Sequence, residues 1–145
     1  MRSALVNKAI DTAAVLAEVA ASKNGAAVLF VGAVRDSNDG RDVSGIEYSA
    51  YVAMAESEMA VIVSEAAAEF DTDDIVVEHR VGRLGIGEAS VVIAVAHPHR
   101  AQAYEASRFI IEALKRRVPV WKREDYLDGT TEWVDPTTTQ QAARR

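Results

Sequence analysis

The sequence predicts a single α+β domain in which amphipathic helices alternate with pairs of strands. Two observations point to this class. The β-branched, strand-like segments come in adjacent pairs, which favours an α+β sheet over a doubly wound parallel one. The chain has 145 residues, 49% of them hydrophobic, which is enough for one domain with a buried core. We expect this domain at residues 1–135, followed by a polar tail at 136–145.

The first third of the chain predicts a helix, a strand and a loop. Asp11 is a suitable N-cap for a helix reaching about residue 22, and Gly25 is placed to follow its end. Residues 26–35 are a continuous apolar run typical of a buried strand. The next segment, DSNDGRD, is rich in turn formers, and we expect a mobile loop there.

The middle of the chain predicts a strand at 43–49 and a helix at 52–70, whose apolar residues recur at helical spacing among glutamates. Residues 74–81 and 89–96 are β-branched strands that we expect to pair as neighbours. The glycines between 82 and 87 connect these strands and open no helix. We therefore interpret them as a turn rather than as a phosphate-binding loop.

The last third predicts a helix at 99–117 that Pro119 ends, because proline cannot continue a helix. Strands at 120–126 and 131–134 flank Asp128-Gly129, a strong signal for a tight hairpin. The expected order is α-β-β-α-β-β-α-β-β, so that the chain starts with a helix.

Composition excludes several classes of function. The chain has no cysteine, so any sulfur chemistry must use sulfur from another molecule. No secretion signal and no apolar run of about 20 residues is present, and we expect a soluble, cytoplasmic protein. The net charge of -6 disfavours binding to nucleic acids or anionic membranes.

Positive charge is nevertheless concentrated in one segment. Lys115, Arg116, Arg117, Lys122 and Arg123 are five of the 16 basic residues. Like charges disfavour the protonated form of a lysine, so the Lys115 amine is a candidate nucleophile or acid–base group. The alternative is that these cations only complement the dipole at the end of the helix.

A second set of basic residues lies at element ends. His99 and Arg100 open a predicted helix, where free N–H groups attract anions such as phosphate, and Arg35 lies where a strand meets a loop. The alternative is a capping histidine beside a solvated arginine. The histidine spacing does not favour a metal site, and the aspartates after Arg35 lack the glutamate that a calcium loop requires.

Three segments carry a family resemblance: FVGAVRD, AHPHRAQAYEASRFIIEALKRRVPVWKRE and, after the Asp-Gly turn, EWVD. Together they resemble the large, catalytic subunit of molybdopterin synthase over residues 26–135. The spacing of the two lysines across a proline and Trp-Lys is the most specific part. The resemblance implies a fold of the α+β hammerhead type.

The resemblance also implies a reaction and its partners. The large subunits form a homodimer, and a small ubiquitin-like subunit ending in Gly-Gly docks at each end, which gives a two-plus-two heterotetramer. The C-terminal thiocarboxylate of the small subunit supplies two sulfurs that convert cyclic pyranopterin monophosphate to molybdopterin. No bound cofactor and no metal are implied.

Site residues follow from matching motifs. Lys115 and Lys122 match the catalytic lysines of the family. The groups expected to bind substrate are Val34, Arg35, His99, Arg100, Arg123 and Glu124. The resemblance further suggests that each site combines the two lysines of one chain with His99 and Arg100 of the other.

Three features depart from the family pattern. The N-terminal strand of the family is missing from the predicted elements. The segment AHPHR, whose second residue is His97, has an extra His and Pro. Ile111 replaces an expected methionine. Two other functions remain open: a non-catalytic adaptor that binds the tail of a ubiquitin-like protein, and a protein that binds a pterin or nucleotide phosphate. Retention of both lysines argues against the adaptor, and the lack of a glycine-rich loop entering a helix argues against nucleotide binding.

Overall fold

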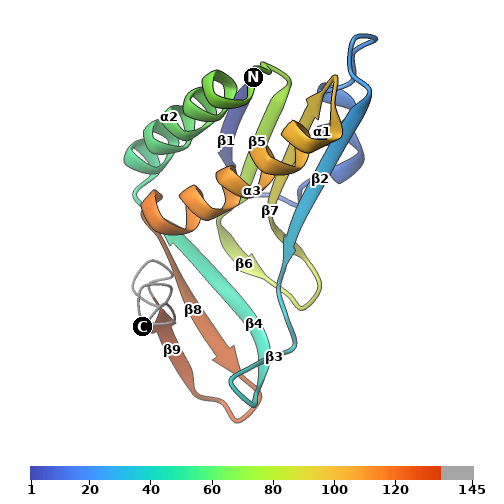
Figure 1. Cartoon of the computed structure of the whole chain (residues 1–145). Coiled ribbons are helices and arrows are strands. Elements are labelled where there is room, and N and C mark those ends of the chain that lie inside the picture. The colour runs from blue at the N-terminus through green and yellow to red at the C-terminus, as the bar shows by residue number, and fades with distance from the viewer. Residues whose placement is uncertain (135–145) are drawn as a thin grey trace.

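A computed structural model of the chain describes residues 1–134, which form two sheets and three helices (Figure 1). The polar tail predicted at 136–145 lies outside the described residues, as does Asp135. Within the described part, no helix is both long enough and apolar enough to cross a membrane.

The first sheet has four strands in the order β1-β5-β7-β2. They are β1 (Arg2–Val6), β5 (Ile75–Arg80), β7 (Ala89–His97) and β2 (Ala26–Ala33). β1 and β5 run parallel, whereas β5–β7 and β7–β2 are antiparallel. The predicted pairing of the two central strands is therefore confirmed.

Helices cover both faces of this sheet. α2 (Val52–Phe70) and α3 (Arg100–Arg117) pack together on one face, and α1 (Thr12–Glu18) packs on the other. The sheet can bury both faces because its central strands are apolar at successive positions, and side chains alternate between the faces of a strand. The face toward α2 and α3 contributes Ile75, Val77, Val91, Ile93 and Val95. The face toward α1 contributes Val76, Val92, Ala94 and Ala96.

The second sheet extends beyond the helices at one end of the first (Figure 1). Its path is β3 (Ser37–Asn38), β4 (Arg41–Ala50), β8 (Val120–Tyr126) and β9 (Thr131–Val134), and β6 (Gly82–Leu84) also pairs with β4. β8 and β9 are the predicted C-terminal hairpin. The α+β prediction is confirmed, and the helix at 52–70 has the predicted bounds.

The prediction that the chain starts with a helix is wrong. β1 precedes α1 and pairs with β5, with Arg2 opposite Val76 and Val6 opposite Arg80. Its residues are only partly buried at the edge of the sheet, so they lack the alternation that marks a strand. The N-terminal strand of the family is therefore present.

The predicted mobile loop after Arg35 is a tight hairpin. Asp39 and Gly40 both have positive φ angles, 50° and 76°, which is the requirement of the two-residue turn that Asp-Gly favours. β3 and β4 continue from it on either side. The predicted turn at 82–87 is also partly a strand, since β6 lies within it.

The first helix is shorter than predicted. Asp11 is its N-cap, as expected, and its side chain accepts a hydrogen bond from the Ala14 N–H at 3.0 Å. The helix ends at Glu18, so Gly25 does not terminate it. Gly25 instead lies against the backbone of Pro98, whose carbonyl oxygen would be 2.7 Å from an added Cβ.

Candidate functional site

A cavity of about 180 Å³ lies where the end of α3 meets the second sheet. Its larger polar side chains come from four separate parts of the chain: the segment after β2, strand β4, the end of α3 and strand β8. The side chains that matter for chemistry are Arg35, Asn38, Tyr48, Lys115, Lys122 and Glu124. Ile111, which replaces the expected methionine, lines its apolar wall.

Lys115 and Lys122 reach this cavity because the chain reverses between them. Lys115 is in the last turn of α3, which Val118 caps by donating its N–H to the Leu114 carbonyl. Pro119 cannot continue the helix, and β8 starts directly after it. Alternation along β8 then directs Lys122 into the cavity, where it lies cross-strand from Tyr48.

The surroundings of Lys115 favour its neutral amine. Burial lowers the pKa of Lys115, and the nearby ammonium of Lys122 lowers it further. Part of the prediction was wrong, because the other neighbouring cations do not contribute. Arg117 pairs with Glu58 and Glu65 of α2 at 2.7 and 2.6 Å, and Arg116 is exposed.

Tyr48 and His79 complete the environment of Lys115, although no sequence motif marks either residue. All three line a second cavity of about 20 Å³, and the rings of Tyr48 and His79 pack edge to face, 5.3 Å apart. Burial lowers the pKa of His79 to about 4. The charge of Lys115 acts in the same direction, and a backbone hydrogen bond to Arg80 acts against it. His79 is therefore neutral near pH 7.

Glu124 provides negative charge in this cavity. Its side chain is almost fully buried, and its Oε1 lies 3.1 Å from Nζ of Lys122. Burial alone would raise the pKa of Glu124, but hydrogen bonds from Asn38, Tyr126 and Lys122 lower it below the ordinary value. Glu124 is therefore a buried carboxylate that stays ionised, as its pairing requires.

The charges in the cavity suit an anionic substrate. Three cationic side chains, Arg35, Lys115 and Lys122, line it together with the single carboxylate of Glu124. Such a site can hold a phosphate or carboxylate, and a lysine whose pKa is lowered can exchange protons with the reacting groups more readily than an ordinary one. Among residues 1–134, no group of three or more His, Cys, Asp or Glu side chains is arranged to hold a metal ion.

Arg123 does not line the cavity, although we expected it beside Glu124. Strand alternation places it on the opposite face of β8. There its guanidinium pairs with Glu47 at 3.0 Å and with Asp125 at 2.9 Å.

Val34 and Arg35 have different positions. Val34 is buried in the core, and its N–H and carbonyl bond to the backbone of Glu88 and Gly87. It supports the strand end from which Arg35 reaches the edge of the cavity. Arg35 is thus the member of this pair that can contact a substrate.

His99 and Arg100 lie at the opposite end of α3 from Lys115. Arg100 and Lys115 are separated by most of the helix, about 22 Å at 1.5 Å per residue. His99 makes no side-chain cap, and its N–H donates to Nδ1 of His97 at 2.8 Å. One chain alone does not bring these residues to the lysine cavity, and their predicted arrival from a second copy remains a prediction.

Sequence comparison identifies relatives over most of the chain. Residues 5–117 match the family model described as MoaE protein. The chain is 44% identical to the molybdopterin synthase catalytic subunit of Thermoplasma volcanium over 75% of its length and 80% of that protein. It is 41% identical to catalytic subunit 1 of Mycobacterium tuberculosis, covering 90% of the chain and 88% of the relative. The catalytic subunit of Emericella nidulans is 40% identical over 81% of the chain, which spans only 60% of that longer protein.

Solved structures show the same architecture. A molybdopterin synthase structure from Staphylococcus aureus superimposes with a TM-score of 0.85 at 35% identity, covering 90% of this chain and 95% of that one. The MoaE protein of Burkholderia ambifaria gives 0.80 at 34% identity, covering 99% and 95%. The fold also matches, at 23% identity and a TM-score of 0.72, a chain from a Helicobacter pylori complex of molybdopterin-converting factor subunits 1 and 2, with coverage of 91% and 89%. With its match to the family model, its relatives and its fold, the chain belongs to the MoaE family, the family of molybdopterin synthase catalytic subunits.

Proposed function

We propose that this chain places sulfur on cyclic pyranopterin monophosphate to form molybdopterin, in the cytoplasm. The sulfur comes from the C-terminal thiocarboxylate of a small ubiquitin-like subunit ending in Gly-Gly. One observation carries the proposal: Lys115 and Lys122 enter a single cavity with Arg35 and Glu124. An external sulfur donor also suits a chain that has no cysteine.

The cationic side chains of the cavity divide into two roles, binding and proton transfer. Arg35 and Lys122 supply positive charge for the substrate phosphate and the incoming C-terminal tail, and they hold both in reacting geometry. Lys115, whose pKa is lowered by burial and by Lys122, exchanges protons with the reacting groups or accepts the acyl group transiently. His79, neutral near pH 7, adds no further charge to its surroundings.

The sulfur transfer balances without an oxidant or reductant. The thiocarboxylate sulfur forms a bond to a carbon of the pterin side chain as a carbon–oxygen bond at that carbon breaks, and the oxygen leaves as water or as the released phosphate oxygen. The pterin is then joined to the small subunit through an acyl–sulfur link. Water then breaks the carbon–sulfur bond on the acyl side. This leaves sulfur on the pterin and an ordinary carboxylate on the small subunit, and a second thiocarboxylate repeats the cycle.

The complete site takes residues from two copies of the chain, because His99 and Arg100 lie about a helix length from Lys115. In a two-fold homodimer, the start of α3 in one copy can approach the end of α3 in the other. The N-terminus of a helix with an arginine is suited to phosphate. With a small subunit at each end, the assembly is a two-plus-two heterotetramer.

Reconstitution tests this function. The purified chain is mixed with thiocarboxylated small subunit and cyclic pyranopterin monophosphate, and dithiolene product is measured. We expect product with the wild-type chain and none when the small subunit ends in an ordinary carboxylate. Binding of the small subunit without any product would overturn the proposal and favour the adaptor function.

A further inference from the structure

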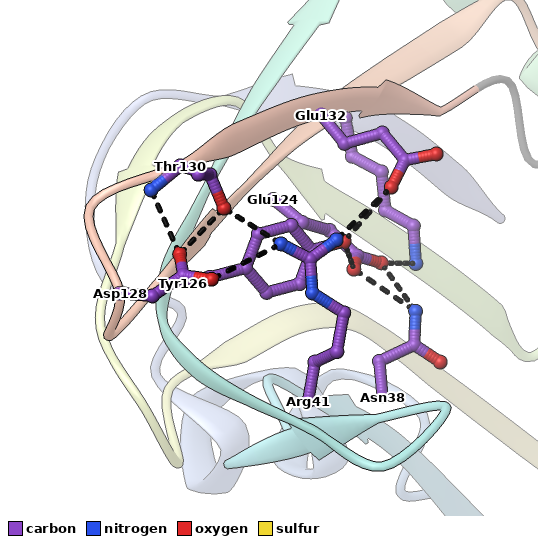
Figure 2. Close-up of polar contacts among 8 residues, drawn as sticks. Asn38, Arg41, Glu124, Tyr126, Asp128, Thr130 and Glu132 are labelled. Atoms are coloured by element: carbon purple, nitrogen blue, oxygen red, sulfur yellow. Dashed lines mark hydrogen bonds and ion pairs between the residues drawn. The ribbon is translucent and has the colours of Figure 1, made fainter.

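The carboxylate of Glu124 is held by two neutral side chains that are not part of the reaction described above. Nδ2 of Asn38 lies 2.9 Å from both Glu124 oxygens, and the Tyr126 hydroxyl donates to Oε2 at 2.9 Å. Figure 2 shows these groups converging on the carboxylate from the β3–β4 and β8–β9 hairpins. A buried carboxylate needs such donors to remain charged.

The Glu124 carboxylate is the counter-charge of Lys122. The side chains of Lys122 and Glu124 lie on the same face of β8, two residues apart, and their charged atoms are 3.1 Å apart. A lysine has a long flexible side chain, and here it also faces the like charge of Lys115. The position of the Lys122 ammonium therefore depends on a fixed and ionised Glu124.

Tyr126 is itself fixed from its other side. The Arg41 guanidinium lies 3.5 Å from the centre of the Tyr126 ring. Arg41 also donates to the Thr130 hydroxyl at 2.6 Å, and it lies 3.6 Å from carboxylate oxygens of Asp128 and Glu132 (Figure 2). Burial, with the neighbouring Glu124, raises the pKa of Tyr126 to about 12, so its hydroxyl remains a donor.

We propose that Asn38 and Tyr126 are positioning residues, which act through Glu124 to hold the Lys122 ammonium in the cavity. Their effect on turnover rests on the function proposed above. Neither residue needs to touch the substrate. Loss of either donor leaves the carboxylate less stabilised and easier to protonate, and a protonated Glu124 no longer restrains Lys122.

The test uses Tyr126→Phe and Asn38→Ala, with Thr130→Val as the matched control. Tyr126→Phe keeps the ring beneath Arg41 and removes only the hydroxyl. Thr130→Val removes two side-chain hydrogen bonds from the same hairpin network, one from Arg41 and one to Asp128, without touching Glu124. Thermal unfolding of each variant shows whether the hairpins still fold.

Two measurements need no substrate. The titration of the Glu124 carboxyl is followed by carbon NMR, and the labelling rate of the Lys122 amine is followed by mass spectrometry. We expect Glu124 to titrate at higher pH in both variants and Lys122 to be labelled several-fold faster. Thr130→Val should match the wild type in both measurements.

The groups facing Glu124 are the same in every comparison except for the one removed. They are Asn38 of β3, Lys122 and Tyr126 of β8, Arg41 of β4 and Glu132 of β9 beyond the Tyr126 hydroxyl, and Lys115 and Arg35 across the cavity. Because the other groups are unchanged, a raised pKa of Glu124 in a variant should move the acid limb of its pH–rate profile to higher pH. Sulfur transfer at neutral pH should also be roughly tenfold slower.

An unchanged Glu124 titration in folded Tyr126→Phe would overturn the inference, as would an equal effect of Thr130→Val. The NMR and labelling results stand even if the wild-type chain transfers no sulfur. In that case the proposed function fails, while the positioning of Lys122 by Asn38 and Tyr126 is judged independently.

Discussion

Replacement of Lys115 by methionine separates the chemistry of this residue from its packing. Methionine keeps an unbranched side chain against the apolar wall of the cavity and removes the amine. A general acid–base group contributes about 10²- to 10⁴-fold to a rate, which is about 2.7–5.4 kcal/mol of the activation barrier. We therefore expect single-turnover sulfur transfer to fall by at least about a hundredfold.

The same change should not reduce the free energy of unfolding. The pKa of Lys115 is lowered in the folded chain by burial and by Lys122, from an ordinary value of 10.5. Because the unfolded chain binds the proton more tightly, the stability of the wild type rises with pH between the folded value and 10.5. At pH values below that window Lys115 is charged in both states. The folded chain is then destabilised by the full free-energy cost of burying this charge beside Lys122.

Lys115→Met lacks this cost, so it should unfold at a higher temperature than the wild type at neutral pH. The advantage should shrink as the pH approaches 10.5. Calorimetry across this range, beside single-turnover rates, measures both effects. A variant that transfers sulfur at the wild-type rate, or one whose lost stability accounts for its lost activity, would refute the reasoning.

Three further outcomes follow from the same site. Lys122→Ala should be severely but incompletely impaired, because neighbouring cations partly replace a positioning charge; a loss of thermal stability large enough to explain the defect would refute this. A small subunit truncated by its final Gly-Gly should still bind in a pull-down assay but give no product, since binding needs surface complementarity and chemistry needs the tail; unchanged turnover would point to another sulfur donor. Arg100→Ala and Lys115→Ala chains, each nearly inactive alone, should recover about a quarter of wild-type activity after dissociation and random pairing, because half of the dimers are mixed and each mixed dimer has one intact site. No recovery in dimers shown to be mixed would mean that both groups act within one chain.

Elements with strong local signals could be predicted from the sequence. The helix at 52–70 has apolar residues at helical spacing, and the hairpin around Asp128-Gly129 has a glycine where its turn takes a positive φ angle. The strands that the sequence did not predict are those that are recognisable only from the strands they pair with. β1 pairs with a strand some 70 residues away, and β3 and β6 have two and three residues, too few to show a period.

The lysine pair could be located for a similar reason. Lys115 and Lys122 are close in sequence, and Pro119 between them forces the helix to end and the chain to turn. Tyr48 and His79 belong to β4 and β5, and only the tertiary fold brings them to Lys115. No sequence period connects such residues.

Two errors came from signals present in the sequence. Arg123 follows Lys122 directly on a strand, so alternation already places it on the other face. Asp39-Gly40 is the same turn dipeptide as Asp128-Gly129, yet the polar residues around it favoured a loop. That interpretation hid Asn38, whose amide contacts Glu124 only because the hairpin folds back.

The source of the sulfur is the most direct test of the proposed reaction. A small subunit carrying heavy-isotope sulfur in its thiocarboxylate is mixed with this chain and cyclic pyranopterin monophosphate, and the product is weighed by mass spectrometry. The proposed reaction predicts a product with two heavy sulfur atoms and the release of two small subunits ending in ordinary carboxylates. A product whose sulfur is unlabelled, or thiocarboxylate consumed without any sulfur on the pterin, would contradict it.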